Sequence, residues 1–516
     1  MKKAIFTNYK HIDFWLFLIL LTAIILHLIQ FFFHTSMWFD ELTCALNIRD
    51  RSFYQLATQS LDYNQVAPLG FLLLEKLSTL IIGVNDHAYR FFPLVFSLIS
   101  LLLFLNISKQ FFKGIALLSV FTLCAGSVSL WFYGGEAKQY SGDITASLFM
   151  VWAALHLMKP DIKKSTFWLI AIGGFILILC SLPAIVIAPL VISVVFISLI
   201  KRRINLSKQS LYLIAFVWGI ACLLLALYAK FIISTTVQAD MSNYWSRGFI
   251  PLNNIGEGLT WILSGLKKEL NFFLSAWMQD VYPSIKFISL ILLIFSVPGI
   301  IYLSKKYKSL IVILFAPLIT ALLLSIFRIL PFDSRVAVYA TWPLVFSGIA
   351  GVQALQQWLP RLFPSTVTNA VSLTIALPIL LITIFSPTER PPFNGQPTQL
   401  VLHELKKQWK HGDILFVYFK TRHALNFYGA KEGFTEYRVG GNYNTIEPHL
   451  RQLDSLKGNK RVWFIYSQWT EKQPFPDSIK SYLGNVIGKE IYNIPDPHGG
   501  EESSEAAAYL YDLTNR

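Results

Sequence analysis

Residues 14–33 read FWLFLILLTAIILHLIQFFF, an apolar run without a charged side chain. A helix of about 20 apolar residues spans the hydrocarbon core of a bilayer. The run is longer than the core of a signal peptide, and no small-residue cleavage site follows it. Lys2, Lys3 and Lys10 precede it. The sequence therefore predicts a retained first transmembrane helix with its N-terminus in the cytoplasm.

Charge is distributed unevenly along the rest of the chain. Of 516 residues, 54% are apolar and 14% charged, whereas a soluble domain averages roughly 25% charged. Residues 1–386 hold 28 of the 44 basic and 15 of the 30 acidic residues, and residues 387–516 hold the other 16 and 15. This predicts a transmembrane domain over 1–386 and a soluble domain over 387–516. Lysines scattered through an apolar chain do not form a basic patch, which argues against a nucleic-acid partner.

Eleven more apolar runs follow the first, and the basic clusters in the short loops decide which of them cross. If 67–83 stays on the outer side, the clusters at 109–113, 159–164, 201–208 and 305–308 all lie inside. Glu75 and Lys76 in its middle also disfavour crossing. We therefore predict an interfacial or re-entrant helix there and eleven spans: 14–33, 91–108, 115–133, 142–158, 166–182, 183–200, 211–233, 284–303, 309–330, 336–357 and 366–386.

This topology places most acidic residues of the membrane domain outside. Only Asp13 and Asp161, of the 15 in residues 1–386, face inward. Chemistry is therefore expected in the outer loops 34–90, 134–141, 234–283 and 331–335.

The last 130 residues follow a proline-rich linker, with prolines at 387, 391, 392 and 397. The runs DILFVYF at 413–419 and RVWFIY at 461–466 are apolar after their first residue and predict short buried strands. Helical periodicity covers 400–410, 422–428 and 446–456. The pattern predicts a small α/β domain outside the membrane.

Polar residues gather at the outer ends of the spans. Asp40 and Glu41 follow the first helix, either as a helix-terminal charge pair or as a carboxylate base at the membrane surface. In residues 134–140 (GGEAKQY) two glycines let the backbone approach closely. Glu136, Lys138 and Tyr140 then recur within about one helical turn, unless this is only a solvated hairpin.

Two further segments carry candidate binding residues. The turn PFDSR at 331–335 ends in Arg335, and Tyr339 lies one turn into the next helix. Arg335 can snorkel to water or form a fixed anion site. The segment YNQVAPL at 63–69 supplies Tyr63 and Gln65, and Arg90 opens a later span. The alternative is an amphipathic interfacial helix.

The order of these motifs resembles a known family. Asp-Glu after the first helix is followed by Pro-Leu at 68–69, Arg-x-x-Pro at 90–93, Glu-x-Lys-x-Tyr at 136–140 and a late Arg near Tyr. The chain is similar here to the GT-C membrane glycosyltransferases, most nearly the protein O-mannosyltransferases and the lipid A aminoarabinose transferase. The resemblance covers residues 10–160 and 320–350. The family commonly has a charged residue before Pro-Pro-Leu, where QVAP stands at 65–68, and often Arg at Lys138.

The resemblance implies a multi-pass, GT-C type protein, mostly α-helical, of a bacterial inner membrane. It implies an inverting glycosyltransferase that moves a sugar from a polyprenyl-phosphate donor to a glycan, lipid or protein acceptor on the periplasmic side. Asp40 is the implied base, a role worth about 10²–10⁴-fold in rate. Glu136 is the second implied catalytic residue, either to hold Lys138 in place or to help bind the acceptor. Lys138 and Arg335 are the implied cations beside the leaving phosphate. The implied substrate-binding residues are Glu41, Tyr63, Gln65, Arg90, Tyr140 and Tyr339.

Fixed cations make a metal dispensable, so no cofactor is expected, although Asp40, Glu41 and Glu136 could hold a divalent ion. The main alternative is a lipid or solute transporter or flippase without glycosyl transfer. Such proteins place charges near the bilayer midplane in broken helices, whereas the ionisable residues here concentrate at the outer ends. A purely structural anchor for the C-terminal domain leaves the outer acidic residues unexplained.

Overall fold

A computed structural model describes residues 2–33, 36–159, 161–201, 207–233, 235–276, 283–385, 396–467, 475–495 and 506–514. The chain forms two compact units. The first comprises residues 1–33 and 51–393, and the second comprises 34–50 and 394–516. The segment 34–50, predicted as part of the first outer loop of the membrane domain, thus packs within the second unit. The predicted boundary at 386/387 and most of the proline linker lie outside the described residues.

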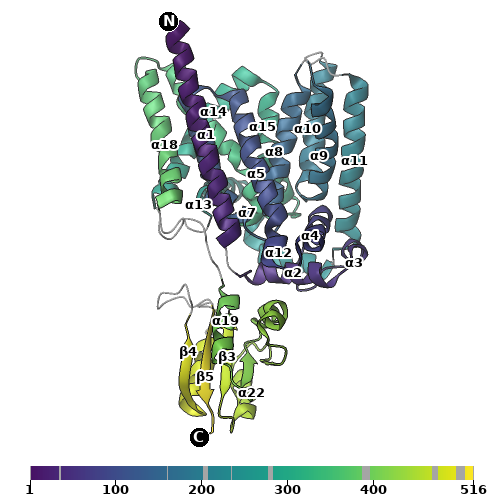
Figure 1. Cartoon of the computed structure of the whole chain (residues 1–516). Coiled ribbons are helices and arrows are strands. Elements are labelled where there is room, and N and C mark those ends of the chain that lie inside the picture. Colours follow the sequence, from purple (N-terminus) through teal and green to yellow (C-terminus); the bar gives the residue numbers. More distant parts are fainter. Residues whose placement is uncertain are drawn as a thin grey trace. The chain divides into compact units, whose positions relative to one another are not determined.

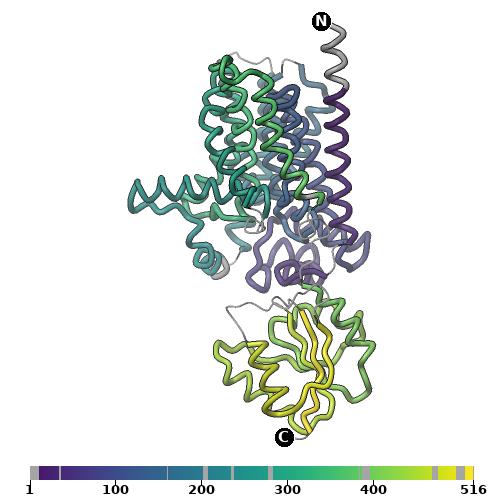
Figure 2. The backbone as a smooth tube through the Cα atoms, turned by 90° about the vertical axis from the view of Figure 1, so that its left-hand side faces the viewer, coloured from purple at the N-terminus to yellow at the C-terminus, as the bar shows by residue number. Residues whose placement is uncertain are grey.

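The first unit is a bundle of helices, many of which run side by side (Figures 1 and 2). Its helices are α1 (Lys2–Phe33), α3 (Phe53–Thr58), α4 (Leu69–Ile82), α5 (Asp86–Phe111), α6 (Gly114–Ala125), α7 (Val128–Gly134), α8 (Tyr140–Leu157), α9 (Lys164–Leu179), α10 (Ala184–Ile200), α11 (Lys208–Phe231), α12 (Thr235–Tyr244), η1 (Ser246–Gly248), α13 (Ile255–Ser275), α14 (Pro283–Tyr307), α15 (Leu310–Ile326), α16 (Ser334–Ala337), η3 (Val338–Ala340), α17 (Trp342–Trp358) and α18 (Ser365–Phe385).

Each predicted span contains a helix or a bent pair of helices. Within the described residues, five helices are long and apolar enough to cross a membrane, and seven spans result if the bent pairs α6–α7 and α16–α17 each count as one. Three shorter apolar helices, α9, α10 and α15, add to these. Length and composition thus support a multi-pass membrane protein, and the count of eleven stays a prediction.

The predicted interfacial run 67–83 forms α4, which has 14 residues. At about 1.5 Å per residue, a helix of this length is shorter than the hydrocarbon core of a bilayer. Leu80 and Ile81 expose 65% and 75% of their surface, as a lipid-facing edge would. These features agree with the interfacial prediction.

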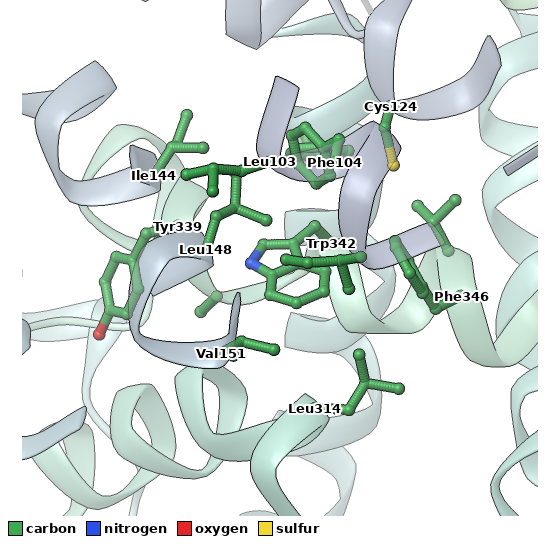
Figure 3. Packing of buried hydrophobic residues seen from close by; sticks show 14 of the residues in the cluster. Leu103, Phe104, Cys124, Ile144, Leu148, Val151, Leu314, Tyr339, Trp342 and Phe346 are labelled. Atoms are coloured by element: carbon green, nitrogen blue, oxygen red, sulfur yellow. The ribbon is translucent and has the colours of Figure 1, made fainter. Parts of the chain in front are cut away.

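The core of the bundle centres on Trp342, which is fully buried. Its ring packs edge-to-face against Phe104 at 5.8 Å and Phe346 at 5.3 Å between centroids (Figure 3). Close approach between α14 and α17 depends on small residues, because a Cβ at Gly299 would overlap the backbone of Ser347. Such small-residue interfaces are typical of membrane helices.

The second unit contains one five-stranded sheet in the order β2-β1-β3-β5-β4. β1 pairs in parallel with β2 and β3, whereas β5 is antiparallel to β3 and β4. Its elements are α2 (Phe39–Asp50), α19 (Thr398–Gln408), β1 (Ile414–Val417), α20 (Arg422–Ala424), η4 (Leu425–Gly429), α21 (Ala430–Glu432), β2 (Arg438–Val439), α22 (Ile446–Leu453), η5 (Asp454–Leu456), β3 (Val462–Ser467), α23 (Phe475–Ser481), η6 (Tyr482–Val486), β4 (Lys489–Ile494) and β5 (Ala506–Asp512).

The two buried strands predicted at 413–419 and 461–466 correspond to β1 and β3, which form the centre of this sheet. The small α/β domain is therefore confirmed. An ion pair anchors its central strands, since Arg461 Nε lies 2.6 Å from Asp413 Oδ1.

Candidate functional site

The loop at 135–139 is packed tightly against the bundle. A Cβ at Gly134 would overlap the side chain of Ser97 on α5, and one at Gly135 would overlap Gln30 on α1. The glycines therefore permit the close approach that the sequence suggested. The loop is not a solvated hairpin, because Glu136 and Lys138 are only 1% and 4% exposed.

Lys138 joins this loop to the segment before α4. Its Nζ donates a hydrogen bond of 2.6 Å to Oε1 of Gln65, and both side chains are buried. The neighbouring Gln139 Nε2 donates to the carbonyl of Val66 at 3.5 Å. Two segments more than 70 residues apart in the sequence, both predicted to carry site residues, thus meet in the fold.

Arg335 lies over aromatic rings of the same region. Its guanidinium carbon is 5.8 Å from the ring centroid of Tyr140 and 5.9 Å from that of Trp245. Tyr140 packs edge-to-face against Tyr133 at 5.0 Å. Tyr133 interacts electrostatically with Glu136, Arg335 and Tyr140. The fold therefore brings Tyr133, Tyr140 and Arg335 into one chain of ring contacts, on which Glu136 acts electrostatically.

The turn that carries Arg335 is held on both sides. Lys268 Nζ on α13 forms an ion pair of 2.6 Å with Asp333 Oδ2. The backbone N–H of Phe332 donates to the carbonyl of Gly248 at 2.7 Å. These contacts fix the backbone on which Arg335 stands.

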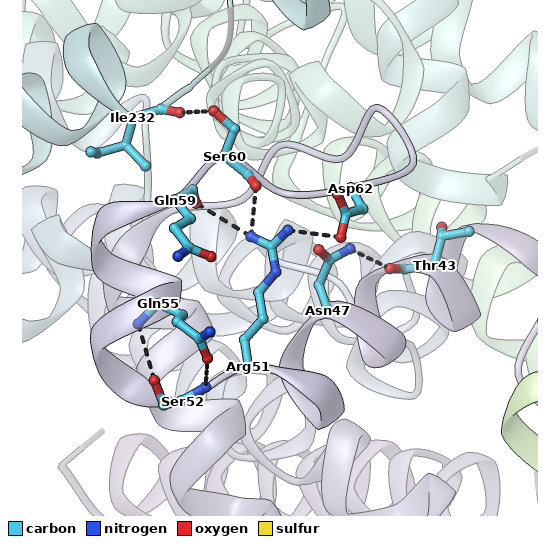
Figure 4. Close-up of polar contacts among 9 residues, drawn as sticks. All are labelled: Thr43, Asn47, Arg51, Ser52, Gln55, Gln59, Ser60, Asp62 and Ile232. Atoms are coloured by element: carbon cyan, nitrogen blue, oxygen red, sulfur yellow. Dashed lines mark hydrogen bonds and ion pairs between the residues drawn. The ribbon is translucent and has the colours of Figure 1, made fainter.

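The segment that carries Tyr63 and Gln65 is shaped by Arg51. Its guanidinium donates to the carbonyls of Gln59 and Ser60 and pairs with Asp62 at 2.8 Å (Figure 4). Beyond this closed loop Tyr63 adopts φ of 62°, in the left-handed region, and is 40% exposed. An exposed tyrosine in a strained conformation beside buried Gln65 is consistent with a binding role.

Two other predicted binding residues are buried on separate helices. Arg90, in the first turns of α5, is 1% exposed. Tyr339, in η3, is 2% exposed and interacts electrostatically with Asp143. Its carbonyl accepts a hydrogen bond of 3.1 Å from Ser147 Oγ.

Asp40 and Glu41 lie in the first turn of α2, in the second unit. Asp40 is half-buried, and its carbonyl accepts a bond of 3.2 Å from Thr43 Oγ1. Glu41 is fully buried and accepts the backbone N–H of Trp38 at 3.2 Å. This bond gives Glu41 the helix-capping role that acidic residues favour in a first turn.

Sequence reasoning missed Glu269, which lies on α13 and also interacts electrostatically with Tyr133. Burial raises the pKa of Glu269 to about 7, and the nearby backbone N–H of Ser334 opposes this rise. Asp333 adds to the rise, and Lys268 opposes it. In the sequence, the only sign of this site was an acidic residue within the amphipathic segment 255–275.

Glu75 is a second buried acid without an assigned role. Neither of its carboxyl oxygens meets a hydrogen-bond donor within the part of the chain that the structure describes. Burial raises the pKa of Glu75 well above its usual range. Glu75 and Asp143 both interact electrostatically with Cys180, so the two acids lie in one region of the bundle.

A divalent ion would need several ligands in one place. Among the residues that the structure describes, no group of three or more His, Cys, Asp or Glu side chains is arranged to hold a metal. Glu41, one of the three residues suggested for this role, already accepts the N–H of Trp38. No step below depends on a metal.

No protein-family model and no curated protein matches the chain. Among solved structures, ArnT from Cupriavidus metallidurans in the apo state matches with 11% identity and a TM-score of 0.51, over 96% of this chain and 98% of that one. The oligosaccharyltransferase of Archaeoglobus fulgidus, in complex with Zn and sulfate, matches with 12% identity and a TM-score of 0.50, over 96% and 73%.

ArnT bound to undecaprenyl phosphate has also been solved, with 12% identity and a TM-score of 0.48, over 96% and 98%. At such identities the likeness to ArnT and the oligosaccharyltransferase is one of fold. The chain therefore shares the fold of ArnT and of the oligosaccharyltransferase.

Proposed function

We propose that the chain is an integral-membrane inverting glycosyltransferase that takes a sugar from a polyprenyl-phosphate donor. The observation that carries the proposal is a polar cluster in which Arg335 lies over the ring of Tyr140 and Tyr140 packs against Tyr133. Glu136 and Arg335 both act electrostatically on Tyr133, and Lys138 lies two residues from Glu136 and from Tyr140 in the sequence. ArnT and the oligosaccharyltransferase, whose fold the chain shares, are both named as sugar transferases. The donor class rests on the resemblance of the motifs.

The chemistry of the cluster suits a leaving phosphate. When the bond between the sugar and the phosphate breaks, negative charge grows on the phosphate oxygens. Fixed cations held in place before the reaction stabilise that charge at no cost in reorganisation. Lys138 and Arg335 are the cations proposed for this role. Aromatic rings hold the guanidinium of Arg335, which limits its freedom.

Asp40 is the proposed base. An acceptor hydroxyl must lose its proton as it attacks, and a carboxylate receives that proton. Attack on the side of the sugar carbon opposite the phosphate inverts its configuration. The acceptor, a glycan, lipid or protein, is proposed to react on the periplasmic face of the inner membrane.

The test is turnover by the purified protein. A set of polyprenyl-phosphate sugars is supplied together with a mixed acceptor pool, and products are identified by mass spectrometry. Asp40→Asn keeps the shape of the side chain but removes the base, so it should lower turnover by at least about tenfold. Movement of an intact donor across the bilayer, without any sugar-bearing product, would instead establish the flippase alternative.

A further inference from the structure

The segment that leads into α2 is bound by residues of the C-terminal sequence. The backbone N–H of Gln399 donates to Ser36 Oγ at 3.0 Å. The backbone N–H of Met37 donates to the hydroxyl of Tyr428 at 2.7 Å, and Met37 is fully buried. The chain is therefore held at two successive residues shortly before Asp40.

The first turn of α2 has a side-chain contact with the same domain. The ring of Phe39 packs edge-to-face against His423, with centroids 5.3 Å apart. Burial, and then the charge of Arg422, lower the pKa of His423 to about 4. His423 is thus neutral at physiological pH, and the contact with Phe39 is an uncharged ring contact.

The C-terminal end of α2 also forms hydrogen bonds with the C-terminal sequence. Arg49 donates to the carbonyl of Asn426 at 2.8 Å and to its side-chain oxygen at 3.1 Å. The guanidinium carbon also lies 5.9 Å from the ring centroid of Phe427. Residues of the C-terminal sequence therefore contact both ends of the 12-residue helix that bears Asp40.

Three of the residues that contact the segment 37–49 lie on one short helix. Asn426, Phe427 and Tyr428 all stand on η4, a π-helix over Leu425–Gly429. π-helical turns are rare; a second one in the same domain, η6, carries Tyr482, whose hydroxyl donates to a carboxylate on η5. The wider turn of η4 presents successive side chains differently from an α-helix, and here residues 426, 427 and 428 all reach the segment 37–49.

We propose that the C-terminal sequence supplies a positioning element of the transferase: within the second unit, the π-helix at 425–429 holds α2 and so fixes the orientation of Asp40 on that unit. The inference rests on the proposed function and gives the domain a role that its α/β fold alone does not indicate. Tyr428, Asn426 and Arg49 act through Asp40 and do not touch substrate. A base misplaced by about 1 Å can cost on the order of 10²-fold in rate.

The experiment compares two Tyr→Phe variants of the full-length protein. Tyr428→Phe removes the hydroxyl that accepts the N–H of Met37. The matched control is Tyr482→Phe, which removes a hydroxyl bonded to Asp454 at 2.8 Å elsewhere in the same domain. We expect Tyr428→Phe to lower kcat by about tenfold or more with the donor KM unchanged, and the control to keep the wild-type kcat.

Hydrogen exchange supplies a readout that does not need activity. The amides of residues 37–50 should exchange faster in Tyr428→Phe, and in Asn426→Ala if Tyr428→Phe does not fold, but not in Tyr482→Phe. Wild-type turnover together with unchanged kcat and unchanged exchange in both test variants would overturn the positioning role alone. Absence of wild-type turnover with every donor would overturn the proposed function, and the catalytic part of this inference with it.

Discussion

At the residue scale, Lys138 and Arg335 are the two cations whose roles can be separated. Lys138 is buried and bonded to Gln65, whereas Arg335 is half-buried and lies over Tyr140 and Trp245. A phosphate can approach a half-buried guanidinium more readily than a buried amine. The same negative group could therefore be bound mainly by Arg335 and reached by Lys138 only in the transition state.

We predict different kinetic effects for the two cations. Arg335→Met should raise the donor KM about tenfold or more, since a hydrogen bond to a charged group is worth about 1.5–3 kcal/mol. Lys138→Met should lower kcat with a smaller change in KM. Steady-state kinetics with the donor varied would measure both. Lys230→Met, which removes a lysine that lies over Phe231 at 5.2 Å, is the control for loss of one charge.

An unchanged kcat/KM in Arg335→Met would exclude Arg335 from the donor site. If kcat and the donor KM are unchanged in both variants, neither cation binds the donor phosphate.

A second residue-scale prediction concerns pH. Burial raises the pKa of Glu269 to about 7, above its ordinary value of 4.5. As pH rises through that interval, the unfolded chain loses this proton while the folded chain keeps it, so Glu269 lowers stability progressively between pH 4.5 and 7. Glu269→Gln should remove this loss. Its Tm should exceed that of the wild type at pH 8 and not at pH 4.5.

Glu257→Gln, on an exposed turn of the same helix, is the matched control and should follow the wild-type profile. If Tm depends on pH in Glu269→Gln as it does in the wild type, the carboxyl of Glu269 has its ordinary pKa in the folded protein.

At the scale of elements, α14 and α17 illustrate how backbone proximity sets a requirement for glycine. A Cβ at Gly299 would lie 1.8 Å from the carbonyl oxygen of Ser347, and one at Gly351 would lie 1.9 Å from that of Phe295. Neither obstacle is a flexible side chain. The two helices must therefore separate if either glycine gains a methyl group.

We predict that Gly299→Ala destabilises the protein by about 1–3 kcal/mol or more, the usual cost of overpacking. Gly219, in α11, is the matched control because a Cβ there meets no atom within 4 Å. Gly219→Ala should be neutral or stabilise by about 0.5–1 kcal/mol through helix propensity. Thermal unfolding in detergent compares the two. Equal Tm values would show that the α14–α17 contact is looser than described.

At the scale of the whole molecule, membrane topology is the property that the structure supports by helix length alone. The spans follow from apolar runs, but sidedness follows from the distribution of Lys and Arg. Because the proposed site uses residues near 63–69, 134–140 and 331–335, all three segments must face the same side of the membrane.

We predict that a cysteine at Asn85 reacts with an impermeant thiol reagent in intact cells and that one at Ser207 does not. The reason is the charge asymmetry of the loops, which places the 201–208 cluster in the cytoplasm. The four native cysteines, of which three are buried, are first replaced. Both positions are exposed or intermediate in the structure, so burial does not prevent labelling. Labelling at Ser207 but not at Asn85 would reverse the orientation.

The sequence by itself determined the properties that depend on short stretches of chain. Apolar length decides whether a helix can span a bilayer, so each predicted run contains a helix or a bent pair of helices. The helices α3, α12 and α13 lie outside those runs and were not predicted. The two mainly apolar runs at 413–419 and 461–466 identified β1 and β3. β4 was not predicted because five of its six residues are exposed, and β2 because it has two residues.

Tertiary structure alone decided which residues share a site. Lys138 meets Gln65, Arg335 meets Tyr140, and Glu269 joins the group around Tyr133 through contacts between segments 73 to 195 residues apart in sequence. The same is true of residues 34–50, which the sequence placed beside the first membrane helix and which pack within the C-terminal unit. The physical reason is that hydropathy is a sum over neighbours in sequence, whereas hydrogen bonds, ring contacts and burial of a carboxylate depend on distances in space that no local pattern encodes.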